Sequence, residues 1–433
     1  MNLSRLPALV VLCAVPALAQ GPAQEFQLPS GLNCILVESH ERPLIRMELT
    51  TRWDLAELPS GKEGIGGFLA MALDAGGAGP YTRSAFNHAL DDLGMRFTFQ
   101  AHVDAYRWTL VADSRSQETA MELLTDAVVR PVFSGPQVEG QRQAFLKRAG
   151  TLSPGERARR RFLWEVGEPS ARFPPVASPL DRIEYQDLLD FQRRVIRPEG
   201  STLALYGDLN LSQAKQLVLM HLGIWGPGPQ PPLAGLPPKP SAPRPPKPRL
   251  LAVLESRPGA ELWAGSPKAE VGGAAVEVLL PILLSRTARS CFGTMEMAFQ
   301  LSPGGQTPLL IKAKVAQADR DGMPAGFLAG LERLRTRGFT REDLDFARVQ
   351  WKGETVALPL HPEELLHRMV DGRVGPTLEQ AVQRVTLAEV NQALKTLLVP
   401  DRLQYLLLGA DAPMVQAAEK AGLGPSALVG AAE

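Results

Sequence analysis

The chain has 433 residues, of which 45% are hydrophobic, and its 46 basic and 46 acidic side chains cancel. A chain of this length is expected to form two or three domains with cores of ordinary size. The balanced charge provides no field that would favour nucleic acid or an anionic membrane surface, so neither is a leading candidate partner.

The first 19 residues have the pattern of a secretory signal peptide. Arg5 precedes an apolar run of about a dozen residues, and a small-x-small cleavage pattern follows at residues 17–19. A membrane anchor is the weaker alternative, because the run is shorter than the ~20 residues that a bilayer requires and contains Pro7 and Pro16. We therefore predict cleavage after Ala19 and an exported, soluble, periplasmic protein with no membrane span.

The mature chain retains two cysteines, Cys34 and Cys291, which fall in different halves. This pattern predicts no disulfide framework, even though an oxidising compartment would allow one. The stability of the fold is expected to come from core burial.

Alternation of apolar and polar residues predicts strands in the first part of the chain, at residues 26–39 and 44–53, and a strand pair over 96–113. Helical spacing of apolar residues appears at two later sites. These stripes are Phe86/Leu90/Leu93 and Met121/Leu124/Ala127/Val128.

Residues 64–77 read GIGGFLAMALDAGG and predict a short helix between these strands. The apolar stripe at i, i+3, i+4, i+7 and i+8 is its buried side. The stripe comprises Ile65, Phe68, Leu69, Ala72 and Leu73. The opposite face carries Gly67, Ala70, Met71 and Asp74, where a soluble helix usually shows more charge.

Residues 226–249 contain 11 prolines and predict an extended, semi-rigid linker. The linker divides the mature chain into an N-terminal domain at 20–225 and a C-terminal domain at 250–433. Strands and helices mix without a strict β-α-β alternation, so each half is predicted to be α+β with an antiparallel sheet.

The two halves share matching segments, which predict an internal duplication. Residues 182–208 match 384–410, with proline 16 positions after the first arginine and glycine 9 positions after the proline in both copies. Residues 133–148 match 339–354 at nearly the same offset.

These features together resemble the pitrilysin/insulinase family of zinc peptidases, which includes the mitochondrial processing peptidase subunits. The resemblance covers the whole mature chain. It implies a LuxS/processing-peptidase-like α+β fold in which two duplicated halves face each other as a clamshell, each an antiparallel sheet with helices packed on it.

Active members of that family carry His-x-x-Glu-His on the helix that corresponds to residues 64–77. Side chains at i, i+3 and i+4 share one helix face, so the two imidazoles hold Zn²⁺ together while the glutamate activates water. In this chain the resemblance places Gly67 and Met71 at the histidine positions and Ala70 at the glutamate position. The third ligand, a glutamate in relatives, falls on Arg148, and the position one turn earlier, acidic in many relatives, is Gln141. None of these side chains suits a zinc ion, so we predict no metal, no cofactor and no catalytic residues.

Two further sets of residues deserve consideration as sites. Active relatives hold the substrate carbonyl with an arginine and a tyrosine from the second half; here the corresponding segment has Arg286 and Arg289 but no tyrosine, and Phe292 or Phe299 lacks the hydroxyl. On the former zinc face, Asp74 is the remaining carboxylate, and we hypothesise an ion pair with Arg148.

The segment HPEELLH contains His361 and His367 and invites a zinc interpretation. Residues six apart on a helix lie about 120° apart, so the two imidazoles do not converge, and only Glu364 and His367 share a face. A solvated helix with Pro362 in its first turn is favoured. His102 lies on the polar phase of its predicted strand and is interpreted as partly exposed, with a peptide groove as the alternative.

The resemblance thus implies an exported, noncatalytic peptidase homologue that binds an extended peptide or serves as the partner subunit of an active zinc peptidase. Two alternatives remain open. One is an active metalloendopeptidase with an unrecognised metal site, and the other is a structural envelope-assembly protein.

Overall fold

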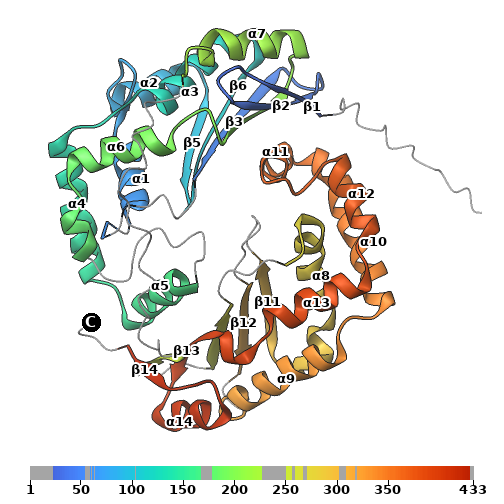
Figure 1. The fold of residues 1–433 in the computed structure, drawn as a ribbon. Helices are drawn as coiled ribbons and strands as arrows, with labels where there is room; N and C mark the ends of the chain where they lie inside the picture. Colours follow the sequence, from blue (N-terminus) through green and yellow to red (C-terminus); the bar gives the residue numbers. More distant parts are fainter. Residues whose placement is uncertain are drawn as a thin grey trace, which may run out of the picture.

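The computed structural model describes residues 23–53, 59, 61–62, 64–102, 104–166, 178–226, 250–255, 259–266, 271–301, 309–316 and 319–429. The predicted signal peptide and nearly all of the predicted proline-rich linker lie outside these residues. Figure 1 shows two α+β halves, the first coloured blue to green and the second yellow to red, each with a six-stranded sheet.

The first sheet has the order β1-β2-β8-β3-β6-β5. Its strands are β1 (Gln24–Gln27), β2 (Asn33–Glu38), β3 (Leu44–Arg52), β5 (Arg96–Ala101), β6 (Ala105–Asp113) and β8 (Ser201–Gly207). The short strands β4 (Gly77–Ala78) and β7 (Pro131–Val132) pair separately. The helices of this half are α1 (Ile65–Ala75), α2 (Arg83–Asp92), α3 (Gln117–Val129), α4 (Gly135–Gly150), α5 (Pro154–Val166), α6 (Tyr185–Val195) and α7 (Leu211–Leu222).

The second sheet has the order β11-β12-β10-β13-β9-β14. Its strands are β9 (Leu250–Leu254), β10 (Ala260–Gly265), β11 (Glu296–Leu301), β12 (Leu309–Val315), β13 (Gln404–Ala410) and β14 (Ser426–Leu428). The helices of this half are α8 (Ala274–Phe292), α9 (Met323–Arg337), α10 (Arg341–Ala357), α11 (Pro362–Val370), α12 (Pro376–Arg384), α13 (Leu387–Leu397) and α14 (Ala412–Ala421). Within the described residues, none of the helices combines the length and apolar character needed to cross a membrane.

The predicted duplication is visible in the topology. The series β2-β8-β3-β6-β5 in one sheet corresponds to β9-β13-β10-β12-β11 in the other. The matched segments become α6 with β8 and α13 with β13, and α4 corresponds to α10. Both α6 and α13 begin with an acid that accepts a backbone N–H, Asp187 from Glu184 at 2.8 Å and Glu389 from Thr386 at 2.6 Å.

The prediction of α+β halves is confirmed, whereas the sheets are mixed rather than purely antiparallel. Strand β8 runs parallel to β2, and β9 runs parallel to both β13 and β14. Parallel neighbours require a long crossover. The chain meets this requirement because β8 and β13 join their sheets only after most helices of their half have been traversed.

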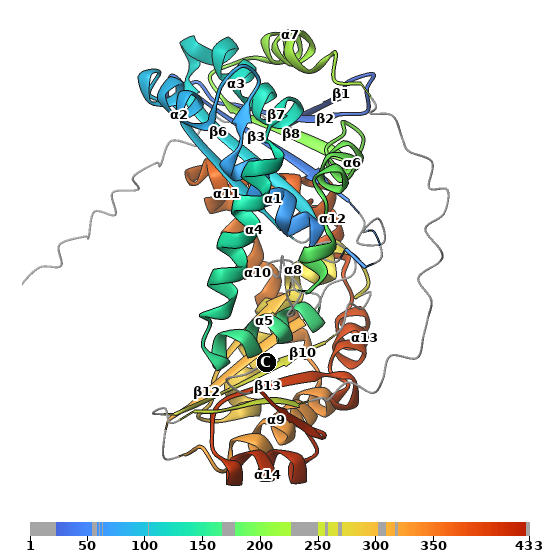
Figure 2. The ribbon, with the colours of Figure 1, turned by 90° about the vertical axis from the view of Figure 1, so that its left-hand side faces the viewer.

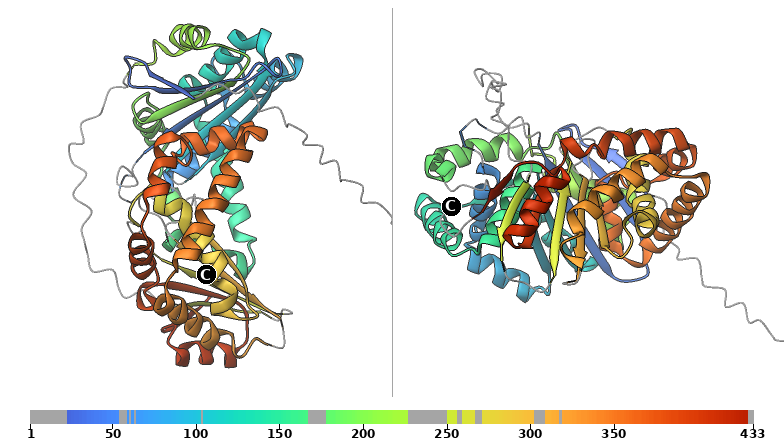
Figure 3. Two further views of the ribbon diagram at one scale, coloured as in Figure 1. Left: turned by 90° about the vertical axis from the view of Figure 1, so that its right-hand side faces the viewer. Right: turned by 90° about the horizontal axis from the view of Figure 1, so that it is seen from below.

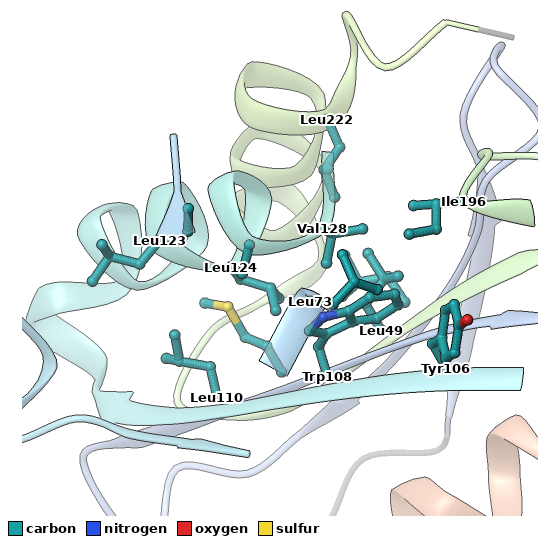
Figure 4. Packing of buried hydrophobic residues seen from close by; sticks show 14 of the residues in the cluster. Leu49, Leu73, Tyr106, Trp108, Leu110, Leu123, Leu124, Val128, Ile196 and Leu222 are labelled. Atoms are coloured by element: carbon teal, nitrogen blue, oxygen red, sulfur yellow. The ribbon is translucent and has the colours of Figure 1, made fainter. Parts of the chain in front are cut away.

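Each half has its own core between its sheet and the helices on one face. Figure 4 shows strand side chains of the first core, among them Leu49, Tyr106 and Trp108, packed with Leu73 of α1 and Leu124 of α3. The predicted stripes of α1 and α3 are buried as expected. The stripe at 86–93 is shorter than predicted, because α2 ends at Asp92 and Leu93 after it is 43% exposed.

The other face of each sheet is covered by a helix from the opposite half. Helix α11 packs on β3 and β8, while α5, its counterpart in the duplication, packs on β9 and β13. Both exchanges are visible in Figure 1, and Figure 2 shows α5 among the strands of the second sheet. The left view of Figure 3 shows helices of the second half, in orange, reaching the first sheet.

The two exchanged helices make chemically different contacts. Helix α5 joins an apolar cluster in which Phe162 and Val166 pack with Trp263 and Leu406 of the second sheet. A Cβ on Gly265 would lie 2.4 Å from a methyl group of Val166, so this position needs glycine for close packing. The contact of α11 with the first sheet is polar.

Candidate functional site

The helix face on which the resemblance places zinc ligands is largely buried in this chain. Gly67 and Ala70 are buried, and Met71 is partly buried against the first core. Asp74 is exposed and forms an ion pair with Arg83 at 3.6 Å. The hypothesis of an Asp74–Arg148 ion pair is therefore wrong: among the described residues no such pair occurs, and Arg148 is exposed on α4.

A different arginine of α4 reaches α1. The guanidinium carbon of Arg142 lies 4.8 Å from the ring centroid of Phe68, and its nitrogens donate to the carbonyl oxygens of Leu180 and, at 2.6 Å, Ile183. From the sheet side, the Tyr106 hydroxyl donates to the carbonyl of Gly66 at 2.5 Å. These contacts hold α1 between the sheet, α4 and α6.

Zinc does not fit the residues at this position. Glycine and alanine offer no donor atom, a thioether binds Zn²⁺ poorly, and the guanidinium of Arg142 beside the helix repels a dication. Across the described residues, no three His, Cys, Asp or Glu side chains come together in a way that would hold a metal ion. Both cysteines are free and buried, and burial raises the pKa of the Cys34 thiol to about 12, so it is not a nucleophile at neutral pH.

Arg286 and Arg289, which lie in the segment that the resemblance relates to carbonyl binding, have other surroundings in the structure. Arg286 of α8 donates to Asp343 at 2.9 Å and to Glu342 at 2.8 Å, and Arg289 is exposed. Phe292 is buried in the second core, where its ring packs against Phe299. Arg286 therefore links α8 to α10, and Phe292 belongs to the second core.

A cluster of charged residues lies where α11 meets the first sheet, and we call it the interhalf cluster. Its centre is Arg107 of β6, whose side chain is 4% exposed. Arg107 donates to Asp371, just after α11, at 3.1 Å, and its Nε lies 3.0 Å from the carboxylate of Glu48. Arg52 of β3 also forms an ion pair with Asp371. A buried guanidinium thus joins acids from both halves of the chain.

Glu48 is the least well satisfied member of this cluster. Its side chain is 2% exposed, and the Nε–H of Arg107 donates to the hydroxyl of Thr50 at 3.3 Å rather than to Glu48. Burial raises the pKa of Glu48 to about 7, against the attraction of Arg107 and Arg46. The carboxyl therefore changes charge near neutral pH.

His367 of α11 lies in the same cluster, and the prediction of a simply solvated helix is wrong for this residue. Nη1 of Arg107 lies 2.5 Å from Nδ1 and 2.8 Å from Nε2 of the ring. Burial, reinforced by the positive charge of Arg107, lowers the pKa of His367 to about 4. The predicted helix itself is confirmed, with His361 preceding Pro362 at its start.

His102 also lies close to the cluster, in the turn after β5 rather than within a strand. The residue is partly exposed, as expected, although its Nε2 atom is buried without a hydrogen bond. Burial and then the charge of Arg107 lower its pKa. The imidazole is therefore held in its neutral form.

The sequence alone does not predict the interhalf cluster, because polar residues on one face of a strand are equally consistent with a face exposed to water. The alternation in β3 and β6 places Glu48, Thr50 and Arg107 on the polar face, which would normally face water. Their cover, α11, lies more than 250 residues farther along the chain. The cluster has the chemistry of an interhalf contact that responds to protonation, and none of its members is placed with a nucleophile or metal site.

Comparison with known proteins agrees with this architecture. The sequence profile of a family described as the peptidase M16 inactive domain matches residues 182–350, and no curated protein matches the chain. A peptidase M16 inactive domain from Pseudomonas fluorescens is similar over 90% of this chain and 98% of its own length, with a TM-score of 0.69 and 18% identity.

A periplasmic protease from Escherichia coli, PqqL, is also similar. The structure of its first half matches over 93% of this chain and 98% of that half, with a TM-score of 0.65 and 14% identity. In the complete PqqL structure, which has a TM-score of 0.65 and 13% identity, the match covers 94% of this chain and 50% of PqqL. At these identities the likeness establishes the fold.

Proposed function

We propose that the chain is a noncatalytic homologue of the insulinase/pitrilysin (M16) peptidases. The observation that carries the proposal is the state of α1. Gly67, Ala70 and Met71 stand where the resemblance places two zinc ligands and the general base, and the first two are buried. Gly67 and Ala70 offer no donor atom and Met71 offers only a thioether, so these three positions cannot hold Zn²⁺ or activate water.

We further propose that the chain binds extended peptides or serves as the partner of an active peptidase. The length relationship supports the partner role, because this chain corresponds to half of PqqL. The arrangement around Arg286 argues against the simplest version, in which this chain completes the carbonyl site of its partner, since Arg286 is already bound to Asp343 and Glu342. Peptide binding is therefore the leading role.

Export to the periplasm is part of the same proposal. It rests on the signal-peptide pattern of residues 1–19, and the structural similarity to the periplasmic protease PqqL is consistent with it. We place the mature domains at 20–225 and 250–433, joined by the proline-rich segment at 226–249.

The decisive experiment uses the purified chain from residue 20 to its end. We expect substoichiometric zinc after dialysis, no chelator-sensitive cleavage of a mixed fluorogenic peptide library, and measurable binding of unlabelled peptides from the same library by competition. Stoichiometric zinc with chelator-sensitive cleavage would overturn the noncatalytic assignment. Absence of both cleavage and peptide binding would refute the peptide-binding role and favour a structural one.

A further inference from the structure

A pocket of about 500 Å³ opens between α8 and α10 of the second half. Arg368 of α11 and Arg373, which follows α11, also line the pocket. The volume lies within the range of about 300–1,000 Å³ that is typical of ligand sites. No zinc position or interhalf contact described above uses this pocket.

One wall of the pocket is apolar. Val278 and Ile282 are four residues apart on α8 and present one stripe, and Phe346 of α10 also lines the space. Phe346 is 42% exposed, and its ring is covered on one side by the guanidinium of Arg286 at 4.2 Å. A large apolar side chain that remains this exposed beside a pocket provides contact area for a ligand.

The charged lining consists of three guanidinium groups and two carboxylates. Two of the arginines are already neutralised. Arg286 bonds to Asp343 and Glu342, and Arg368 bonds to Glu364 at 2.7 Å and lies 3.7 Å from Glu354.

Arg373 is the lining cation that remains. Its hydrogen bond goes to the backbone carbonyl of Leu301 at 3.3 Å, and among the described residues no carboxylate pairs with it. A guanidinium has five N–H donors in a fork that matches a carboxylate. A single guanidinium without a carboxylate partner in the described part of the chain matches one carboxylate of a ligand.

We propose that this pocket binds the C-terminal carboxylate of a peptide whose last side chain is apolar. Arg373 holds the carboxylate, and Val278, Ile282 and Phe346 contact the terminal side chain. The inference rests on the proposed peptide-binding function and specifies which end of the peptide is recognised. The glutamates of the lining, Glu277 and Glu354, disfavour ligands with more than one negative charge.

The test compares two fluorescein-labelled decapeptide mixtures that end in leucine, one with a free C-terminal carboxylate and one with a C-terminal amide. Anisotropy with the full mature chain should show about ten- to hundredfold tighter binding of the free acid, the range for a charge-assisted contact. Arg373→Gln should abolish this preference. Arg341→Gln, which removes an exposed charge on α10 outside the pocket, is the matched control and should preserve it.

A second variant fills the pocket without changing its charge. Ser285→Phe places a ring in the space from an exposed position on α8 and should weaken binding of the free acid at least tenfold. Equal binding of acid and amide, or binding unaffected by either pocket variant, would overturn the pocket while leaving peptide binding elsewhere intact. Failure of both mixtures to bind the wild-type chain would overturn the pocket and the peptide-binding function together.

Discussion

The carboxylate of Asp371, at the end of α11, accepts a hydrogen bond of 3.1 Å from the guanidinium of Arg107 in the first sheet, and both side chains are at least 94% buried. This is an ion pair between residues 264 positions apart. Breaking a buried pair by removing one partner leaves an uncompensated charge in a poorly solvated place. The contact therefore matters for how the two halves are held together.

Asp371→Ala should lower the free energy of unfolding by about 3 kcal/mol, because Arg107 stays buried with only the partly protonated Glu48 as an acidic neighbour. Urea denaturation followed by circular dichroism measures this loss. The control is Glu363→Gln, which removes an exposed ion pair with Arg46 at 3.6 Å and should cost less than about 1 kcal/mol. Equal losses of unfolding free energy in the two variants would show that the buried Arg107–Asp371 pair contributes no more to stability than the exposed Arg46–Glu363 pair.

The stability of the chain should depend on the protonation of Glu48. Its folded pKa of about 7 lies above the ordinary 4.5, so between these values the folded chain holds a proton that the unfolded chain has released. Protonated Glu48 therefore makes its full contribution to the free energy of unfolding below pH 4.5. This contribution, about 3 kcal/mol, is lost as the pH rises to 7. Glu48→Gln stays neutral, so the stability of this variant relative to wild type should rise over that interval and level off above pH 7. Parallel profiles of unfolding free energy would show that Glu48 does not titrate in this way.

His367 should contribute with the opposite sign. Its folded pKa of about 4 lies below the ordinary 6.5, so the unfolded chain binds a proton in this interval that the folded chain does not. Stability from this group is complete above pH 6.5 and is lost as pH falls toward 4. His367→Gln should flatten the acid side of the stability profile, and NMR titration of the histidine ring in the wild type would check the low pKa directly.

The apolar contact of α5 should be as important as the polar contact of α11. Phe162 is fully buried against the second sheet, so Phe162→Ala should cost about 3–5 kcal/mol through lost contacts and a cavity. Arg160→Ala, two residues away and 40% exposed, should change stability by less than about 0.5 kcal/mol. Hydrogen exchange of β13 amides should speed up in the first variant only.

Introducing a His-x-x-Glu-His motif into α1 should not create a zinc site. Gly67→His, Ala70→Glu and Met71→His together introduce three polar side chains, two of them at buried positions near Arg142. We expect a loss of at least about 2 kcal/mol from overpacking and burial of polar groups, and no stoichiometric zinc in metal analysis. Met71→His alone, at the partly buried position, is the tolerated control. A stable triple variant that retains one zinc per chain would refute this expectation.

Local sequence patterns were sufficient to predict the elements on which the site is built. The stripe from Ile65 to Leu73 predicted α1, and the alternation over 96–113 predicted the pair β5 and β6. The helix and strand after Arg182 recur after Arg384 because both copies keep the same order of helix, proline and apolar strand. The assignment of Gly67, Ala70 and Met71 to the positions of zinc ligands and general base remains a prediction, since it depends on side-chain identity and on the resemblance alone.

Other features depend on which surfaces meet, and only the tertiary structure decided them. Glu48 and Arg107 lie on strand faces that their pattern assigns to water, and they become buried because α11 arrives from the other half. The parallel alignment of β2 with β8 and the choice of Arg142 rather than Arg148 beside α1 are of the same kind. The periodicity of apolar residues predicts which side chains share one face of a helix or strand. Whether that face is buried depends on contacts with distant segments, which the local sequence pattern does not encode.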